Sequence, residues 1–309
     1  MTYQDEPTSL EELGQLTKLA DGGQGTVHRA ALMPGELYKR YHNPQELNVA
    51  ELKRLVRRVY AEPMPEHARE LILHSTAWPT GVVLEQGKYT GMTMPEAASK
   101  FTAQIGGRSK LQELQYLIFG RKPIWGEGLV LPNPDQRREL VLGFVRLFKA
   151  LHDVDIIIGD VSPRNFLWSV EPHPTVYALD CDGFRVNGYD PPTPQAQTPD
   201  WEDPDQETGR ATFESDRFKL ALLVIRVLLT EPKTTPKDVA SDPVRRAQLG
   251  DRVAELAVRV ADGERCHAVE WLHAFDNRPT LQFDPVKPPP ERGQPGPRKG
   301  PDRPTLDFG

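Results

Sequence analysis

Residues 156–167 read IIIGDVSPRNFL, and the interpretation of the chain starts from this stretch. An apolar run ends at Gly159, and Pro163 breaks the segment that follows, so a helix across it is excluded. Asp160 and Asn165 therefore lie five residues apart on a loop between two hydrophobic stretches. A carboxylate and an amide held between buried flanks indicate a functional loop whose two side chains face one cleft.

The composition limits the class of protein. The 309 residues are 38% hydrophobic and 27% charged with a net charge of −6, which is typical of a soluble globular protein with disordered parts. The negative balance argues against a general nucleic-acid-binding surface, because phosphate contacts need a basic surplus. The main local exception is a basic cluster interpreted as a solvated helix face, formed by Lys53, Arg54, Arg57 and Arg58.

The negative charge argues against nucleic-acid partners, and three further features predict a cytoplasmic protein without membrane partners. Only Cys181 and Cys266 are present, which favours a reducing compartment and no disulfide framework. Residues 1–16 have neither a basic start nor a long apolar core, so we expect no signal peptide. The most apolar stretch, 218–229, is too short to span a bilayer and contains two basic residues.

Sequence patterns predict an α+β fold with a small strand-rich lobe followed by a larger helical lobe. The strand-like segments are 15–32 around a glycine-rich tip, 35–42, and 81–97. The helical segments are 44–60, 135–153, 214–229, 244–263 and 268–275. We expect the first lobe to cover residues 1–94 and the second to cover 95–284, joined by a tight linker at Pro95.

Two further segments are rich in proline. Residues 285–309 contain eight prolines, and this composition predicts a disordered tail, because it cannot bury a core. The stretch 187–210 is similarly polar, but it lies inside the chain, where a long loop is more often functional than idle.

The glycine-rich tip and one lysine are compatible with phosphate binding. In GGQGTV, Gly22, Gly23 and Gly25 leave backbone N–H groups unobstructed, so that these groups can close over phosphates. Alone, such a tip favours a plain hairpin turn. Lys39 lies on the next strand, twelve residues after Val27, where it can reach phosphates held under the hairpin.

Oxygen ligands for a metal follow on either side of a hairpin. Mg²⁺ prefers oxygen ligands and bridges phosphates. Asn165 offers a neutral oxygen, and the strand in VYALDCDGF ends at Asp180 and Asp182. With these groups assigned to the metal, Asp160 is free to accept a hydroxyl proton or to orient a nucleophile.

Together these segments resemble the eukaryotic-like Ser/Thr protein kinases, in which the same four motifs occur in this order. The matching segments are DGGQGTV, Lys39, GDVSPRN and LDCDGF, with His152 eight residues before Asp160. The resemblance covers roughly residues 12–283. It implies a two-lobed protein-kinase-like fold, ATP and Mg²⁺ as cofactors, and transfer of the γ-phosphoryl group to a protein hydroxyl.

The resemblance also implies roles for individual residues. The glycine loop and Lys39 would position the phosphates, and Asp160 would align the acceptor hydroxyl. Asn165 and Asp180 would hold Mg²⁺, with Asp182 as the alternative carboxylate. The segment MTMPEA resembles the hinge that receives adenine, and its residues in contact with the base would be Met94, Glu96 and Ala97.

Three later motifs favour a protein kinase over other kinase-like folds. They are TPDWEDPD at 198–205, SDRFKLA at 215–221 and NRPT at 277–280. They resemble the end of the activation loop, the start of a buried helix and a late Arg-Pro-Thr motif. The resemblance implies that Asp216 holds the backbone of the catalytic loop and that Arg278 pairs with Asp205. It also implies that Lys39 pairs with a helix glutamate, Glu51 or alternatively Glu46.

Three positions depart from the family pattern. Ala20 replaces the first glycine of the loop, Gly159 replaces an arginine before Asp160, and Ser162 replaces a lysine two residues after it. Without that arginine, a phosphate on the activation loop has no ready partner, so we expect activity without loop phosphorylation. The missing lysine leaves Arg164 as a possible substitute and keeps open a pseudokinase scaffold that binds ATP or partners without efficient transfer.

Two other resemblances bear on function. GDVSPRN is also similar to the loop of aminoglycoside and choline kinases, so a small-molecule phosphotransferase is a third alternative. YKRYHNP and AWPTGVVLEQGKYTGMTMPEA resemble a bacterial branch of the protein kinases associated with stress-linked operons. That resemblance implies a von Willebrand-A protein and a metal-dependent phosphatase as partners.

Overall fold

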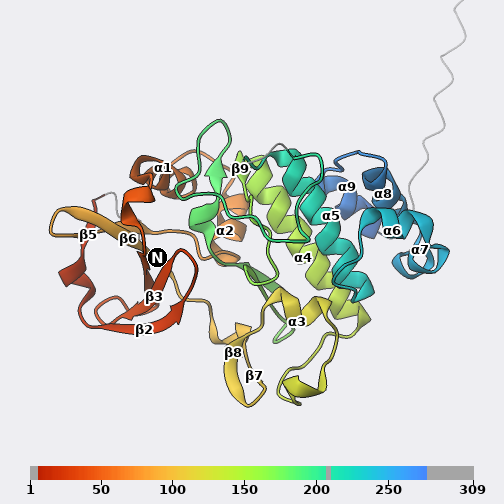
Figure 1. Cartoon of the computed structure of the whole chain (residues 1–309), viewed down its shortest axis with the longest axis horizontal. Coiled ribbons are helices and arrows are strands. Elements are labelled where there is room, and N and C mark those ends of the chain that lie inside the picture. The colour runs from red at the N-terminus through yellow and green to blue at the C-terminus, as the bar shows by residue number, and fades with distance from the viewer. Residues whose placement is uncertain (1–5, 207–209, 277–309) are drawn as a thin grey trace, which may run out of the picture. The chain divides into compact units, whose positions relative to one another are not determined.

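The N-terminal part of the chain forms a six-stranded sheet, shown in red to orange in Figure 1. The strand order is β1-β5-β6-β4-β3-β2, with β1 parallel to β5 and the other pairs antiparallel. The strands are β1 (Thr8–Ser9), β2 (Leu16–Asp21), β3 (Gly25–Ala30), β4 (Glu36–Tyr41), β5 (Gly81–Glu85) and β6 (Lys88–Pro95). The computed structural model describes residues 6–206 and 210–276, so Arg278 and the tail 285–309 lie outside the described residues.

Turn geometry and side-chain alternation explain this sheet. Gln86 and Gly87 have positive φ angles of 51° and 76°, as a two-residue hairpin between β5 and β6 requires. On β4, Lys39 and Tyr41 are buried, and the residue between them is exposed. Gly91 on β6 permits close approach of β4, since a Cβ there would lie 2.0 Å from the carbonyl oxygen of Lys39. Neighbouring strands on both sides thus fix the backbone at Lys39.

The helix expected over 44–60 begins later, as α1 (Val49–Tyr60). Asn48 caps it by accepting a hydrogen bond from the backbone N–H of Glu51, which sets the starting point. The apolar face that α1 buries consists of Leu52, Leu55, Val56 and Val59. A further helix, α2 (Glu66–His74), follows, and the sequence patterns did not predict it.

The second lobe is mainly helical, as predicted (Figure 1). Its helices are α3 (Leu114–Ile118), α4 (Pro134–Asp153), α5 (Phe213–Leu229), α6 (Pro236–Ser241), α7 (Pro243–Leu249), α8 (Asp251–Ala261) and α9 (Ala268–Phe275). α5 is buried on most sides, which explains why it is apolar nearly all round. The single helix predicted over 244–263 is divided into α7 and α8, because Gly250 interrupts it with a φ of 79°.

Three two-stranded sheets complete the strands of the described residues, and two of them adjoin the loop that contains Asp160. They are β7 (Thr102–Ile105) with β8 (Arg108–Leu111), β9 (Ile156–Ile157) with β12 (Arg185–Val186), and β10 (Phe166–Ser169) with β11 (Thr175–Ala178). β9 leads into the loop and β10 leaves it, and both strands are buried. The N–H of Leu179 donates to the carbonyl oxygen of Asn165 at 2.7 Å, so the segment after β11 returns beside this loop.

Packed apolar side chains join the two lobes. One core surrounds α4 and α5, and a second one lies beneath the sheet. The second core includes Leu52 of α1 and Met92 and Met94 of β6, together with Leu167 of β10 and Tyr177 of β11. All described residues belong to one compact unit.

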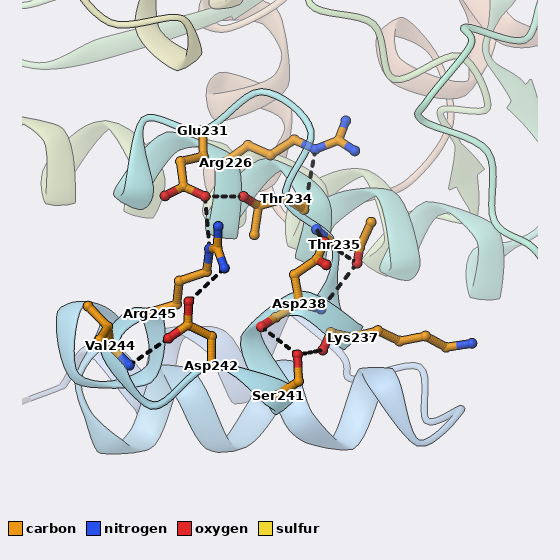
Figure 2. A network of polar contacts seen from close by, with 10 residues as sticks. All are labelled: Arg226, Glu231, Thr234, Thr235, Lys237, Asp238, Ser241, Asp242, Val244 and Arg245. Carbon is orange, nitrogen blue, oxygen red and sulfur yellow. Dashed lines mark hydrogen bonds and ion pairs between the residues drawn. The ribbon is translucent and has the colours of Figure 1, made fainter.

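A polar network fixes the corner between α5, α6 and α7 (Figure 2). The carboxylate of Glu231 accepts hydrogen bonds from Thr234 and Arg245. Arg226, buried in α5, donates from Nε to the carbonyl oxygen of Thr234 and from Nη2 to that of Asp200. This arginine therefore ties the helical corner to the long loop that contains Asp200.

Candidate active site

A buried carboxylate on α5 holds the backbone of the loop that contains Asp160. Asp216 is fully buried and accepts hydrogen bonds from the backbone N–H groups of Ile158, at 2.7 Å, and Gly159, at 2.9 Å. The Nε2 atom of His152 lies 3.1 Å from the same carboxylate. These partners compensate the cost of burying a charge and set the orientation of the loop.

Gly159 and a lysine from α5 complete this support. Gly159 has a φ of 78°, in the left-handed region that favours glycine, so a glycine suits this position better than the arginine that the resemblance implies. Its carbonyl oxygen accepts a hydrogen bond from Nζ of Lys219 at 2.6 Å. Burial lowers the pKa of Lys219, and nearby carboxylates, Asp216 first, oppose this shift. Lys219 thus stabilises the loop backbone at Gly159.

Asp160 and Asn165 lie in direct contact on the loop. The Nδ2 of Asn165 donates to Oδ2 of Asp160 at 3.0 Å. The other carboxylate oxygen, Oδ1, accepts a hydrogen bond from the hydroxyl of Thr198 at 2.7 Å. Both Asp160 and Asn165 are partly exposed. The amide uses its NH₂ group on Asp160, so its oxygen is the atom that can face a cation.

Lys39 lies against both carboxylates of the LDCDGF segment. Its Nζ is 2.9 Å from Oδ1 of Asp182 and 3.1 Å from Oδ1 of Asp180, and the side chain is buried. Burial alone would lower the pKa of Lys39, but the charges of Asp182 and Asp180 outweigh it, and the pKa is raised. Lys39 is therefore a fixed cation at physiological pH.

The two aspartates differ in exposure. Asp180 has a positive φ of 50°, and its side chain is 50% exposed. Asp182 is fully buried, and its Oδ2 accepts a hydrogen bond from the hydroxyl of Tyr41 at 2.8 Å. Asp180 therefore faces solvent beside Asn165, to which its neighbour Leu179 is hydrogen-bonded.

The glutamates expected beside Lys39 lie elsewhere. Among the described residues, the ion-pair partners of Lys39 are Asp180 and Asp182. Glu51 instead pairs with Arg54, one turn further along α1, at 2.9 Å. The alternative residue, Glu46, lines a cavity of about 110 Å³ formed by Gly23, Gln24, Tyr41, His42, Asn43, Glu46, Leu47, Thr193 and Pro194.

The glycine-rich tip closes the hairpin between β2 and β3. The N–H of Gly22 donates to the carbonyl oxygen of Gly25 at 2.9 Å, and Gly23 is exposed at the turn. Val27 pairs with Lys39 in the register of β3 and β4, so the tip lies on the strand next to the lysine. The tip also contacts the long loop, because Nε2 of Gln24 donates to the carbonyl oxygen of Pro194 at 3.3 Å.

The hinge residues lie at the end of β6 and directly after it. Met94 is buried in the core that joins the lobes, and Ala97 packs against that core. The N–H of Glu96 donates to the carbonyl oxygen of Gly35 at 2.9 Å, and its side chain pairs with Arg29. The Glu96 N–H is thus already engaged within the protein.

The end of the long loop is anchored by an arginine that the sequence analysis did not single out. Arg265 donates from Nε to Oδ2 of Asp203 at 3.0 Å, and its Nη2 also contacts Asp205 at 2.6 Å. Asp203 is buried and Asp205 is exposed. The partner expected for Asp205, Arg278, lies outside the described residues.

The beginning of the long loop is attached to the N-terminal lobe. The N–H of Asn48 donates to the carbonyl oxygen of Pro192 at 2.8 Å. The guanidinium of Arg54 lies 3.7 Å from the centre of the Tyr189 ring. The hydroxyl of Thr193 donates to the carbonyl oxygen of Asp182. The beginning of the loop is therefore held between α1 and the segment that contains Asp182.

The donor set fits a magnesium ion. Asn165 and Asp180 present an amide oxygen and a solvent-facing carboxylate from adjacent segments, and Mg²⁺ commonly takes one or two such protein ligands and fills its other positions with phosphate oxygens and water. Within residues 6–206 and 210–276, no group of three or more His, Cys, Asp and Glu could hold a metal ion.

The described helices include none long and apolar enough to cross a membrane.

Comparison with solved structures identifies the fold. The ROP18 kinase domain, solved in complex with AMP-PNP and sucrose, matches with a TM-score of 0.52 over 83% of this chain and 75% of that one, at 16% identity. No protein-family model and no curated protein matches the sequence. The chain therefore has a two-lobed, α+β, protein-kinase-like fold, as its motifs predicted.

The conformation of Gly159 leads to a testable prediction. We expect Gly159→Ala to lower the free energy of unfolding by about 1–2 kcal/mol, because an alanine is strained at this positive φ. The matched control is Gly183→Ala, whose added Cβ would meet nothing within 4 Å and which has no positive φ. Urea unfolding of both variants measures the difference, and equal stabilities would contradict this account of the loop.

Proposed function

We propose that this protein is an Mg²⁺- and ATP-dependent protein Ser/Thr kinase. The observation that carries the proposal is the contact between Asp160 and Asn165 on a loop whose backbone Asp216 fixes from below. A buried lysine and a solvent-facing carboxylate lie beside that loop, on Lys39 and Asp180. Catalysis of phosphoryl transfer needs mainly positioning and charge neutralisation, and these are the groups that supply both.

Nucleotide binding is assigned to the N-terminal lobe. The tip at Gly22, Gly23 and Gly25 would cover the phosphates, and Lys39 would bind them from the neighbouring strand. Because the N–H of Gly22 already donates to the carbonyl oxygen of Gly25, other backbone N–H groups of the tip would make the phosphate contacts. Adenine would lie at the hinge, against Met94 and Ala97. Because the N–H of Glu96 is hydrogen-bonded to Gly35, the base would use other backbone groups of the hinge.

Asp160 is the proposed residue for the acceptor. Its Oδ1 already accepts a hydrogen bond from one hydroxyl, that of Thr198, which supports its suitability for orienting a substrate hydroxyl and accepting its proton. Asn165 and Asp180 would hold Mg²⁺, which when bound neutralises charge on the phosphates. In the absence of a lysine at Ser162, Arg164 is the nearest exposed cation on the loop.

The anchored long loop favours a protein substrate over a small molecule. Asp203 pairs with Arg265, Arg226 stacks on Trp201, and the backbone at Asp200 is hydrogen-bonded to Arg226. An ordered segment of this kind beside Asp160 offers an edge along which a polypeptide could lie. We extend the proposal to a cytoplasmic location and to a von Willebrand-A protein and a metal-dependent phosphatase as partners, on the resemblance alone.

A pseudokinase scaffold is the second candidate. Ser162, which replaces the family lysine, is buried, and its hydroxyl accepts a hydrogen bond from the N–H of Arg164. The loop thus contains no lysine that could steady the transferred group. A protein of this kind would bind ATP and partners without efficient transfer.

Label transfer from ATP separates these functions. With Mg²⁺ and a generic basic protein substrate, we expect the wild-type protein to transfer label, and Asp160→Asn and Lys39→Ala to reduce the rate at least about 100-fold. Nucleotide binding without transfer by the wild-type protein would support the scaffold instead. Transfer to an aminoglycoside or to choline, but not to protein, would support the small-molecule phosphotransferase.

Independence from loop phosphorylation is a separate prediction. Thr198 contacts Asp160 directly, so Thr198→Ala is expected to reduce activity through loss of that hydrogen bond, whereas Thr198→Ser should remain close to wild type. Protein treated with a phosphatase, and shown by mass spectrometry to carry no phosphate, should remain fully active. Loss of activity after this treatment, with recovery on incubation with ATP, would contradict the prediction.

A further inference from the structure

We propose that Asp182 is the carboxylate that positions Lys39 in this protein, in place of a glutamate on α1, and that it is not a metal ligand. The inference rests on the proposed function, because it assigns a task within the same site. It divides the two aspartates of LDCDGF between separate roles. Asp180 remains the carboxylate for the metal, and Asp182 becomes a positioning residue.

Two side chains of β4 hold the carboxylate of Asp182. Lys39 and Tyr41 are two residues apart on one strand, so their side chains lie on the same face. Both reach Asp182, Lys39 with Nζ at 2.9 Å from Oδ1 and Tyr41 with its hydroxyl at 2.8 Å from Oδ2. Each carboxylate oxygen thus has its own donor from β4, and together these bonds fix the orientation of the lysine head group.

Asp182 is buried and Asp180 is not. The side chain of Asp182 is 0% exposed, whereas that of Asp180 is 50% exposed. The main chain of Asp182 is held as well, because its carbonyl oxygen accepts the hydroxyl of Thr193. An ion that arrives with a nucleotide can reach Asp180 from solvent, but it would have to displace Lys39 or Tyr41 to reach Asp182.

The side chains at the start of α1 make their polar contacts away from Lys39. Glu51 is the residue whose N–H is capped by Asn48, and its carboxylate pairs with Arg54. Arg54 in turn stacks on Tyr189 of the long loop. This part of α1 is thus bound to the loop rather than to Lys39. Among the described residues, the ion pairs that hold Lys39 therefore come from Asp180 and Asp182 and not from α1.

A double-mutant cycle tests the assignment. If Asp182 acts through Lys39, then Lys39→Met combined with Asp182→Asn should lose no more kcat/KM than Lys39→Met alone. Losses that multiply would overturn the proposal. Each single variant is also expected to lower the unfolding midpoint by more than the double variant does. Lys39→Met leaves the buried carboxylate of Asp182 without its cation, and Asp182→Asn leaves buried Lys39 with only the half-exposed Asp180 as its ion-pair partner. Since this second cycle needs no activity, it distinguishes failure of the inference from failure of the proposed function.

Magnesium dependence separates the two aspartates. Asp180→Asn is expected to raise the Mg²⁺ concentration for half-maximal rate about tenfold or more, because this variant loses a charged ligand of the metal ion. Asp182→Asn should leave this concentration unchanged while lowering kcat. An increase of similar size in both variants would overturn the proposal.

Two further variants keep the test usable where Asp182→Asn fails to fold. Tyr41→Phe removes one hydrogen-bond donor and no charge, so it should fold and lower kcat with an unchanged Mg²⁺ requirement. Glu51→Gln is the matched control and should remain within about twofold of the wild-type rate. A twofold change corresponds to less than about 1 kcal/mol, since a tenfold change corresponds to about 1.4 kcal/mol. A loss of activity in Glu51→Gln larger than that in Tyr41→Phe would overturn the proposal.

Discussion

The site depends on one buried carboxylate, Asp216. It comes from α5, the helix enclosed on most sides, and it accepts the N–H groups of Ile158 and Gly159. A buried charge is costly without hydrogen-bond partners, so conformations of the loop that remove these N–H groups from Asp216 are disfavoured. Asp216 orients the loop so that Asp160 and Asn165 meet beside the segment that follows β11. The helical lobe therefore sets the position of the loop at which the chemistry is proposed.

Much of this arrangement could be predicted from residue order and spacing. The two lobes, the glycine-rich hairpin and the loop with Asp160 and Asn165 each have a local pattern, and the fold agrees with them. Helix limits were less predictable, because they depend on single capping or breaking residues such as Asn48 and Gly250. Partners across the fold were least predictable, since Arg265 has no local pattern that indicates its contact with Asp203.

The partner of Lys39 shows the same limit most clearly. Asp180 and Asp182 are two residues apart and chemically identical, and only the turn after β11 makes one exposed and the other buried. One local signal was available, because Tyr41 follows Lys39 by two residues on a strand and so shares its face. That signal indicates a second polar group beside the lysine, but it does not identify which carboxylate lies between them. The comparison at 16% identity shows the fold alone, so function rests on the site.

The most direct test of the central claim is a crystal structure with a non-hydrolysable ATP analogue and Mg²⁺. The account predicts phosphates between the glycine-rich tip and Lys39, with the metal ion bound by Asn165 and Asp180 and with Asp182 still paired to Lys39. Adenine should lie at the hinge beside Met94. A nucleotide bound elsewhere, or a metal ion coordinated by Asp182, would contradict the account.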